Sequence, residues 1–203
     1  MPSRSPAMPT DPPSSPELWI LRHGETEWNR DERLQGRLDS PLTARGVAQA
    51  RAQGRILAGC LPGTVRVLCS PAPRALRTAE LALAGLGLRV ETDPRLQEID
   101  LGRWAGRTLP ELRAEHPDLG KATDPHLWKF TAPGGETLDQ MAHRVRGVLD
   151  GLDGPTVIIT HGVTSRLLRC MVLGRPLTDL AGVPGGQGVI HHIRGGMPRV
   201  LVA

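Results

Sequence analysis

The chain contains no tyrosine, a single phenylalanine and only three cysteines among its 203 residues. Lysine is equally scarce, because of the 25 basic residues only Lys121 and Lys129 are lysine and the others are arginine. A nucleic-acid-binding protein more often carries a basic cluster interleaved with aromatic residues, whereas the charges here are dispersed. The net charge of +4 therefore does not predict a nucleic-acid partner.

The few cysteines and the short apolar runs restrict the class of protein further. Cys69 and Cys170 lie in apolar segments, where reduced, buried thiols are expected, and no CxxC pair predicts a zinc site. No apolar run approaches the roughly 18 residues of a membrane helix, so we expect no membrane partner. Residues 1–16 hold six Pro and four Ser, which predicts a disordered tail rather than a signal peptide and favours a cytoplasmic protein.

Motifs for nucleotide and metal binding are also missing. The chain has no GxxxxGK[ST] sequence and no GxGxxG after its first predicted strand, so we expect no nucleotide cofactor. Neither HxH nor HExxH, the usual ligand patterns of metallohydrolases, occurs. His191 and His192 are adjacent in a predicted strand, where they face opposite sides and cannot readily chelate one ion together. We therefore predict neither a cofactor nor a metal.

Strand-like and helix-like segments alternate from Leu18 onward. Short apolar runs predict buried strands at 17–21, 65–70 and 155–160, with further strands at 88–94, 188–196 and 198–203. Helical spacing predicts helices at 40–58, 74–85, 135–152 and 163–174, the first capped by Thr43. This order favours an α/β fold, a three-layer α/β/α sandwich with a mostly parallel central sheet.

The domain organisation follows from the same pattern. No internal repeat and no linker divides residues 17–203, so we predict a single domain behind the tail of residues 1–16. Residues 99–135 are the least regular part, with short helices expected near 108–115 and 124–130. We expect this segment to be an insertion that caps the substrate.

Three buried strand runs end in polar residues that could share one site. The first ends in Arg22 and His23, the second in Ser70 with Arg74 four residues later, and the third in His161. The carboxyl ends of parallel strands lie along one edge of a sheet, which is where open α/β folds bind ligands. Arginine forks, imidazoles and helix N-termini at this edge predict a phosphate site.

A neutral imidazole such as His23 is a good nucleophile toward phosphorus, and a phosphohistidine would divide hydrolysis into two easier steps. Most of the transition-state stabilisation would come from fixed cationic donors to the phosphoryl oxygens. Arg22, Arg74 and a protonated His161 would supply these donors.

An ester leaving group also needs a proton, which a carboxyl group with a raised pKa could give. The candidates are Glu98, Asp100 and Glu136. We expect partial burial to raise the pKa of Glu98, with nearby arginine opposing that shift. Residue chemistry alone favours Glu98 only slightly.

Seven sequence blocks resemble, in order, the signature of the histidine phosphatase superfamily, which has the phosphoglycerate mutase-like fold. They are LRHGETEWN (21–29), LQG (34–36), SPLTARG (40–46), SPAPRALRTAE (70–80), EIDLGRWAG (98–106), PGGET (133–137) and THG (160–162). The resemblance covers essentially Leu18 to Val202.

The resemblance implies a catalytic role for five residues. By this likeness His23 is the phosphorylated nucleophile, and Arg22, Arg74 and His161 complete the phosphate pocket. Glu98 is the proton donor to the leaving group and later the base for water, which selects it over the other carboxylates.

Three more residues match substrate-binding positions of the family. Asn29 is similar to a side chain that helps to bind the phosphoryl group, and Gln35 and Gly36 match a loop that contacts substrate. The substrate classes that the resemblance suggests are sugar phosphates, phosphoglycerate-type acids and the ribazole phosphate of cobalamin assembly. The expected partner is thus a small phosphorylated metabolite, and the oligomeric state is not predicted.

The superfamily contains phosphatases and mutases, and the chain is more similar to the phosphatases. Mutases of the family carry a longer insertion after the catalytic glutamate, with an adjacent arginine pair that grips the substrate carboxylate. Only 37 residues separate Glu98 from Glu136, and no two arginines are adjacent in the chain. A metal-independent phosphomonoesterase is our interpretation, with a cofactor-dependent phosphoglycerate mutase as the alternative and a non-catalytic phosphate binder as a third possibility.

Aromatic residues in the irregular segment are candidates for a substrate pocket. Trp104, Trp128 and Phe130 could form its walls, with Arg107 and Lys129 at the rim. The competing interpretation is that these side chains pack the segment onto the sheet, and for Trp104 it is the favoured one.

Overall fold

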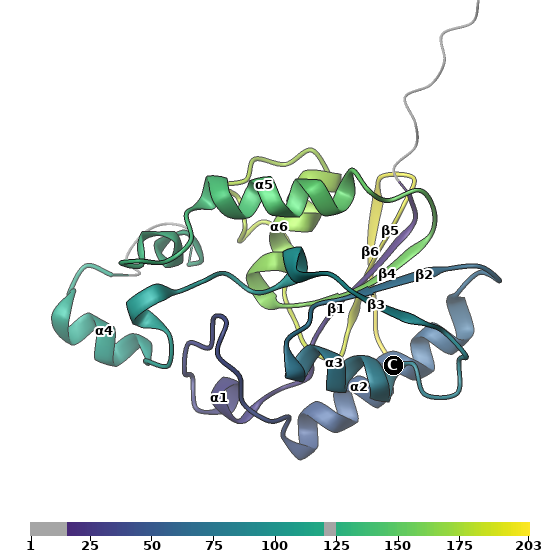
Figure 1. Cartoon of the computed structure of the whole chain (residues 1–203), viewed down its shortest axis with the longest axis horizontal. Helices are drawn as coiled ribbons and strands as arrows, with labels where there is room; N and C mark the ends of the chain where they lie inside the picture. Colours follow the sequence, from purple (N-terminus) through teal and green to yellow (C-terminus); the bar gives the residue numbers. More distant parts are fainter. Residues whose placement is uncertain (1–15, 120–124) are drawn as a thin grey trace, which may run out of the picture.

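The computed structural model describes residues 16–119 and 125–203 (Figure 1). The tail predicted for residues 1–16 lies outside this range except for Pro16, and Lys121 also lies outside it. Within the described residues no helix is both long and apolar enough to cross a membrane.

A mixed sheet forms the centre of the molecule. In the described part of the chain it has six strands in the order β3-β2-β4-β1-β5-β6. The first four of that order pair in parallel, and β5 pairs antiparallel with β1 and β6. Their bounds are β1 (Leu18–Arg22), β2 (Arg66–Cys69), β3 (Val90–Thr92), β4 (Thr156–Thr160), β5 (Ile190–Arg194) and β6 (Met197–Leu201).

Helices cover both faces of this sheet, which confirms the predicted three layers (Figure 1). Helices α2 (Ala44–Cys60) and α3 (Pro73–Ala82) cover one face, and α5 (Leu138–Leu149) and α6 (Gly162–Val172) cover the other. Thr43 caps α2 as predicted, because its side chain accepts a hydrogen bond from the amide of Gly46. Thr137 and Gln140 form a capping box at the start of α5.

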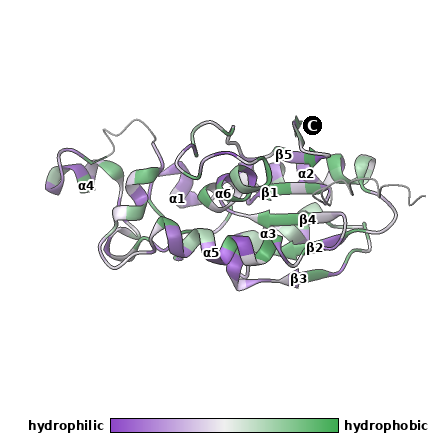
Figure 2. Ribbon diagram, turned by 90° about the horizontal axis from the view of Figure 1, so that it is seen from above, coloured by the Kyte–Doolittle hydropathy of each residue, from purple (hydrophilic) through white to green (hydrophobic). Residues whose placement is uncertain are grey.

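Two hydrophobic clusters hold the layers together, one on each face of the sheet. Successive side chains of β1 alternate between them, because strand side chains point to opposite faces. Leu18 and Ile20 belong to the cluster under α5 and α6, and Trp19 and Leu21 to the cluster under α2 and α3. Figure 2 shows the strands coloured as hydrophobic between helices that carry hydrophilic residues.

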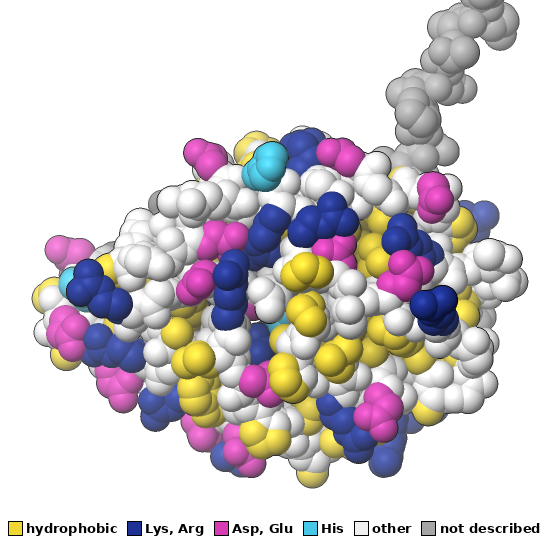
Figure 3. All heavy atoms as spheres, viewed as in Figure 1, with side chains coloured by type: hydrophobic (Ala, Val, Ile, Leu, Met, Phe, Trp, Pro, Cys, Tyr) yellow, Lys and Arg dark blue, Asp and Glu magenta, His cyan; other side chains and the backbone are white. Residues whose placement is uncertain are grey.

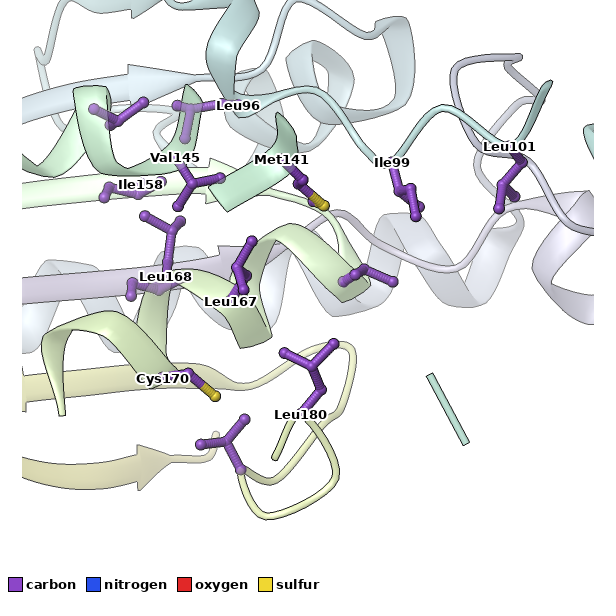
Figure 4. Packing of buried hydrophobic residues seen from close by; sticks show 14 of the residues in the cluster. Leu96, Ile99, Leu101, Met141, Val145, Ile158, Leu167, Leu168, Cys170 and Leu180 are labelled. Carbon is purple, nitrogen blue, oxygen red and sulfur yellow. The ribbon is translucent and has the colours of Figure 1, made fainter. Parts of the chain in front are cut away.

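One face of α5 is buried against the sheet. Met141, Val145 and Val148 are at most 1% exposed. Figure 4 shows that Met141 and Val145 point toward Leu167 and Ile158, on α6 and β4. Burying each such side chain contributes roughly 1.5–3 kcal/mol, so this face fixes α5 and α6 on the sheet.

The irregular segment lies at the end of the molecule far from the C-terminus (Figures 1 and 2). It contains the 3-10 helix η2 (Gly102–Trp104), α4 (Leu109–Glu115) and the 3-10 helix η3 (Leu127–Thr131), and the 3-10 helix η1 (Pro94–Leu96) precedes it. The helix expected near 124–130 is thus a 3-10 helix. The four-residue helix α1 (Glu27–Arg30) was not predicted, because it is too short to show a hydrophobic period.

Candidate active site

The carboxyl ends of β1, β2 and β4 meet at one edge of the sheet, as predicted. His23 and Ser70, the residues after β1 and β2, donate backbone hydrogen bonds to Thr160 and Ile159 of β4. A cavity of about 110 Å³ opens at this edge. Figure 3 shows Lys and Arg side chains around a small hollow in this face, with histidine visible inside it.

This catalytic cavity brings together seven of the eight residues expected in the site. They are Arg22, His23, Asn29, Gln35, Gly36, Arg74 and Glu98; its other lining residues are Arg33, Leu34, Ile99, Leu101, Lys129 and Val163. The eighth, His161, does not line the cavity but lies behind His23. The centroids of the two imidazole rings are 5.2 Å apart and the ring planes meet at 62°.

The His23 ring is held in one tautomer, with a hydrogen bond at each ring nitrogen. Its Nδ1 lies 2.8 Å from the Gly24 carbonyl oxygen, which can only accept, so Nδ1 carries the proton and Nε2 the lone pair. Nε2 accepts a hydrogen bond from Arg74 Nε at 3.3 Å. Burial lowers the pKa of His23 well below its ordinary value, and His161 and Arg22 lower it further, so the ring is neutral near neutral pH.

Two buried nitrogen atoms beside His23 have no hydrogen-bond partner among the described residues. They are Arg22 Nε and His161 Nδ1. His161 Nε2 lies 2.7 Å from Ser70 Oγ, and in the tautomer in which this hydroxyl donates to Nε2, the proton of the ring is on Nδ1. Buried donors without an acceptor are rare and costly, so an acceptor such as a phosphoryl oxygen fits at this point.

His161 differs from the expectation in its charge. Burial lowers its pKa well below the ordinary value, and the positive charges of Arg74, Arg22 and Arg144 lower it further. The side chain is therefore a neutral hydrogen-bond donor in the ligand-free protein, and not the third cation of a clamp.

Arg74 is almost completely buried and hydrogen-bonds both to His23 and to the loop of residues 36–39. Its Nη1 donates to Leu38 O at 2.6 Å and Asp39 Oδ1 at 2.9 Å, and its Nη2 donates to Gly36 O at 2.8 Å. With Nε on His23, four of the five guanidinium N–H groups are engaged. Arg74 thus positions residues 36–39 against His23 and keeps one donor for a ligand.

Glu98 receives four hydrogen bonds, three of them from the start of α6. Its Oε2 accepts from Val163 N, and its Oε1 accepts from Ile99 N and from the N and Oγ1 of Thr164, at 3.0–3.1 Å. Burial raises the pKa of Glu98, but these donors and the Lys129 charge outweigh it and leave the pKa below its ordinary value. The predicted raised pKa is therefore wrong for the ligand-free protein, because the sequence did not show that Glu98 faces a helix N-terminus.

The other two candidate carboxylates are occupied elsewhere. Glu136 binds Arg144 Nε at 2.6 Å and Nη2 at 2.8 Å, and Arg144 Nη1 donates to Gln97 O at 2.8 Å. Asp100 lies 3.4 Å from Arg37. Neither carboxylate lines the catalytic cavity, and Glu136 instead holds the backbone next to Glu98.

Asn29 is fixed by a residue that the sequence analysis missed. Its Oδ1 accepts from Thr26 N at 3.3 Å and from Gln187 Nε2 at 2.9 Å, which leaves the amide NH₂ for a ligand. Gln187 Nε2 also donates to His23 O at 3.2 Å and so connects the loop before β5 to His23. The only signal in the sequence was a glycine-rich PGGQG segment with one polar residue.

The loop that carries Gln35 and Gly36 does reach the cavity. Gln35 Nε2 donates to Thr26 Oγ1 and to Ser40 Oγ, while its buried Oε1 has no partner within the described residues. Gly36 has a φ of +53°, a backbone conformation that glycine adopts without strain, and its carbonyl faces Arg74.

Two glycines allow the turn after His23 to touch helix α2. A Cβ on Gly24 would lie 2.3 Å from Gly46 O, and a Cβ on Gly46 would lie 2.0 Å from Glu25 O. Both distances are far inside van der Waals contact with backbone atoms. The glycines of the RHG and TARG blocks thus determine how closely the turn after His23 packs on α2.

The aromatic residues mainly pack the irregular segment. Trp104 and Trp128 are buried, with ring centroids 5.7 Å apart, and neither lines the catalytic cavity. Arg107 pairs with Glu115 at 2.5 Å, away from the cavity. Lys129 does line it. Within residues 16–119 and 125–203, no group of three or more His, Cys, Asp or Glu side chains is arranged to hold a metal ion.

Comparison with known proteins identifies the family of the chain. The family model of the histidine phosphatase superfamily (branch 1) matches residues 18–197. The chain belongs to the histidine phosphatase superfamily. Curated sequences and solved structures that are similar over most of the chain support this assignment.

The relatives in this superfamily carry both mutase and phosphatase names. A protein of Erwinia tasmaniensis named "probable phosphoglycerate mutase GpmB" is 34% identical over 165 residues, which cover 79% of this chain and 76% of that protein. The α-ribazole phosphatase of Shigella flexneri is 29% identical with a TM-score of 0.77, over 92% of this chain and 95% of that one. A mycobacterial glucosyl-3-phosphoglycerate phosphatase, solved with VO3, is 31% identical with a TM-score of 0.78, over 93% and 97%.

Proposed function

We propose that this histidine phosphatase superfamily member is a phosphomonoesterase that hydrolyses a small phosphorylated metabolite through phospho-His23. One observation carries the proposal: two buried nitrogen atoms without partners among the described residues, Arg22 Nε and His161 Nδ1, belong to the two neighbours of His23, the preceding residue and a ring whose centroid lies 5.2 Å from that of His23. A phosphoryl oxygen bound at His23 is the acceptor that we propose for them. No step below requires a metal ion.

The first step forms the phosphoenzyme. The hydrogen bond from Arg74 Nε to His23 Nε2 breaks, the freed Nε2 lone pair attacks phosphorus, the bond from phosphorus to the ester oxygen breaks, and the leaving oxygen takes a proton from Glu98. Charge on the phosphoryl oxygens is stabilised by Arg22, by His161 and by the remaining N–H of Arg74. The Nδ1 proton stays on its hydrogen bond to Gly24 O and fixes the tautomer.

The second step returns the site to its starting state. The Glu98 carboxylate takes a proton from water, the water oxygen attacks phosphorus, and the bond from phosphorus to His23 Nε2 breaks to release inorganic phosphate. Glu98 is a carboxylate in the ligand-free protein. A phosphoryl dianion bound beside it disfavours the ionised form, so the acid form needed for the first step is produced in the complex.

Hydrolysis, rather than transfer to a second position, is supported by the length of the irregular segment. Only 37 residues separate Glu98 from Glu136, and the chain has no adjacent arginine pair. Two similar solved structures are named as phosphatases. Phosphoglycerate mutase is the second candidate, because the curated relatives carry that name.

We further propose that residues 99–135 cap the substrate. Ile99, Leu101 and Lys129 of this segment line the catalytic cavity, so the segment touches whatever is bound there. The cavity is small and partly enclosed, which supports a small metabolite.

The test is turnover of p-nitrophenyl phosphate in the presence of EDTA, with the His23→Ala variant beside the wild type. We expect wild-type turnover, an acid-labile phosphorylated intermediate on rapid quenching, and neither in His23→Ala. His143→Ala is the matched control, because His143 is an exposed histidine on α5. Activity in His23→Ala, or loss of activity in EDTA, would refute the mechanism.

A second assay separates hydrolysis from transfer. The protein is incubated with 3-phosphoglycerate, with and without a bisphosphate primer, and products are resolved by NMR. Release of inorganic phosphate supports the phosphatase. Primer-dependent formation of 2-phosphoglycerate supports the mutase, and tight binding without turnover of any ester supports a non-catalytic binder.

A further inference from the structure

A second cavity, of about 140 Å³, adjoins the catalytic cavity. The two share Arg22, Glu98, Lys129 and Val163. Glu98 therefore stands between them, at the position of the leaving oxygen in the proposed reaction. A phosphomonoester with its phosphoryl group at His23 would extend its alcohol portion past Glu98 into this second space, which we name the Arg169 cavity.

The Arg169 cavity is lined mainly by cationic and polar groups. Its remaining lining residues are His126, Gly162, Ser165, Arg166, Arg169, Gly185, Gly186 and His191. Among all of its described lining residues, four carry a positive charge and Glu98 is the only carboxylate. The Glu98 oxygens are already turned to backbone donors of α6. The field in this cavity therefore favours an anion.

Arg169 is a buried cation without an acidic partner among the described residues. It is 3% exposed, and its Nε donates to Ser165 O at 3.0 Å. In the part of the chain that the structure describes, no other hydrogen bond or ion pair engages its guanidinium group. Burial and the charge of Arg166 lower the pKa of Arg169 to about 10, so it remains charged near neutral pH. A buried, unpaired charge is costly unless a ligand neutralises it.

Ser165 supplies an independent observation at the same place. The residue is 2% exposed, lines the Arg169 cavity, and its Oγ has no partner among the described residues. A buried hydroxyl without a partner requires an explanation, and a ligand oxygen provides one. Arg166 helps to form the wall, because its Nη1 donates to the carbonyl oxygens of Leu180 and Val183 and so fixes the loop that carries Gly185.

The competing explanation is that Arg169 only complements the C-terminal dipole of α6, since it lies in the last turn. Its geometry contradicts this. The Nε donates to Ser165 O, one turn nearer the N-terminus, so the side chain runs back along the helix. Arg169 thus extends toward the cavity that contains Arg22, away from the last carbonyl groups of α6.

We propose that the Arg169 cavity binds a second anionic group of the substrate, a carboxylate or a phosphate, while the phosphoryl group to be transferred lies at His23. This inference rests on the proposed phosphatase function and narrows its substrate to small molecules with two anionic groups. His191, on β5, borders the same cavity as a neutral imidazole, because burial and Arg169 lower its pKa to about 4. The neutral ring can donate a hydrogen bond to the bound anion.

The experiment compares substrates that differ by one anionic group. Glycerol 3-phosphate is paired with 3-phosphoglycerate for the carboxylate, and fructose 6-phosphate with fructose 1,6-bisphosphate for the phosphate. We expect the wild type to favour the doubly anionic member of one pair in kcat/KM. The variant R169Q should lower that ratio by about 10- to 100-fold, the range of a charged hydrogen bond, and R169K should retain part of it.

The control variant is R199Q, because Arg199 is exposed on β6 and borders a neighbouring cavity that also contains Arg169, but not the Arg169 cavity itself. It should keep the wild-type ratio. Thermal unfolding must show that wild type and R169Q are both folded. If the two proteins then have the same ratio of kcat/KM for the doubly and singly anionic substrates, the inference is overturned. Turnover of p-nitrophenyl phosphate would in that case still support the proposed hydrolysis.

Calorimetric titration with the same four compounds covers the case in which no ester is turned over. The hydrolysis proposal then fails, but tighter binding of a doubly anionic compound that is lost in R169Q upholds the second anion site. Binding that does not depend on the second anion overturns it.

Discussion

Replacing Glu98 with glutamine keeps the shape of the side chain and removes its charge. Three donors face Oε1, and Val163 N faces Oε2 at 3.1 Å. The glutamine oxygen can take the Oε1 position. Its NH₂ group then faces the N–H of Val163, so two donors meet without an acceptor. An unsatisfied buried donor costs roughly 1–3 kcal/mol, so Glu98→Gln should destabilise the protein by about that amount near neutral pH.

The loss should depend on pH in a definite direction. Because the folded-state pKa of Glu98 is depressed, its ionised form contributes stability that is present above the unfolded pKa of about 4.3. That contribution is lost as the pH falls through the folded pKa. Glutamine does not titrate, so the difference between wild type and Glu98→Gln should be largest above about pH 5 and shrink in acid.

Urea unfolding of both proteins across the acidic range measures this difference, with exposed Glu27→Gln as the control that should change little. The same variant tests the role of Glu98 in the reaction. Its kcat/KM should fall by about 10²- to 10⁴-fold for an alkyl phosphate, and by less for p-nitrophenyl phosphate, whose leaving group needs no proton. A stability difference that is equal at all pH values, or equal losses for both esters, would show that the reasoning is wrong.

Three further outcomes are expected. Gly46→Ala should destabilise the protein in thermal unfolding, because a Cβ 2.0 Å from Glu25 O costs about 1–3 kcal/mol, which outweighs the helix-propensity gain of about 1 kcal/mol. Gly59→Ala on the same helix is the control; a Cβ there would meet no atom within 4 Å, so this variant should be neutral or stabilising. Thr78→Val should lower the free energy of unfolding in urea by about 1–3 kcal/mol, because it leaves the Gly24 N–H, which now donates to Thr78 Oγ1 at 3.1 Å, without an acceptor. Thr78→Ser keeps the hydroxyl and should lower it less, and equal losses would contradict the role of this hydrogen bond. The acid limb of kcat/KM should lie below about pH 6.5, because the lowered pKa of His23 keeps its imidazole neutral there, and a limb at or above that pH would refute the lowered pKa.

The sequence by itself determined the layers and most of the candidate site. Short apolar runs and helical stripes report local periods of two and 3.6 residues, and those periods reflect which face of each element is buried. Because parallel strands place their carboxyl ends at one edge, the strand pattern alone was enough to place Arg22, His23 and Ser70 together. The family resemblance then selected Glu98 among three carboxylates.

Only the tertiary structure decided what those side chains meet. The depressed pKa of Glu98 comes largely from amides of α6, 65 residues away in the chain at Val163, and the neutral state of His161 comes from burial near three arginines. The sequence did not predict the contacts of Gln187 or the unpaired charge of Arg169, because a hydrogen bond across the sheet edge or a missing acidic partner depends on residues distant in sequence. Local patterns specify elements, whereas charge states and unpaired donors depend on the packing that brings those elements together.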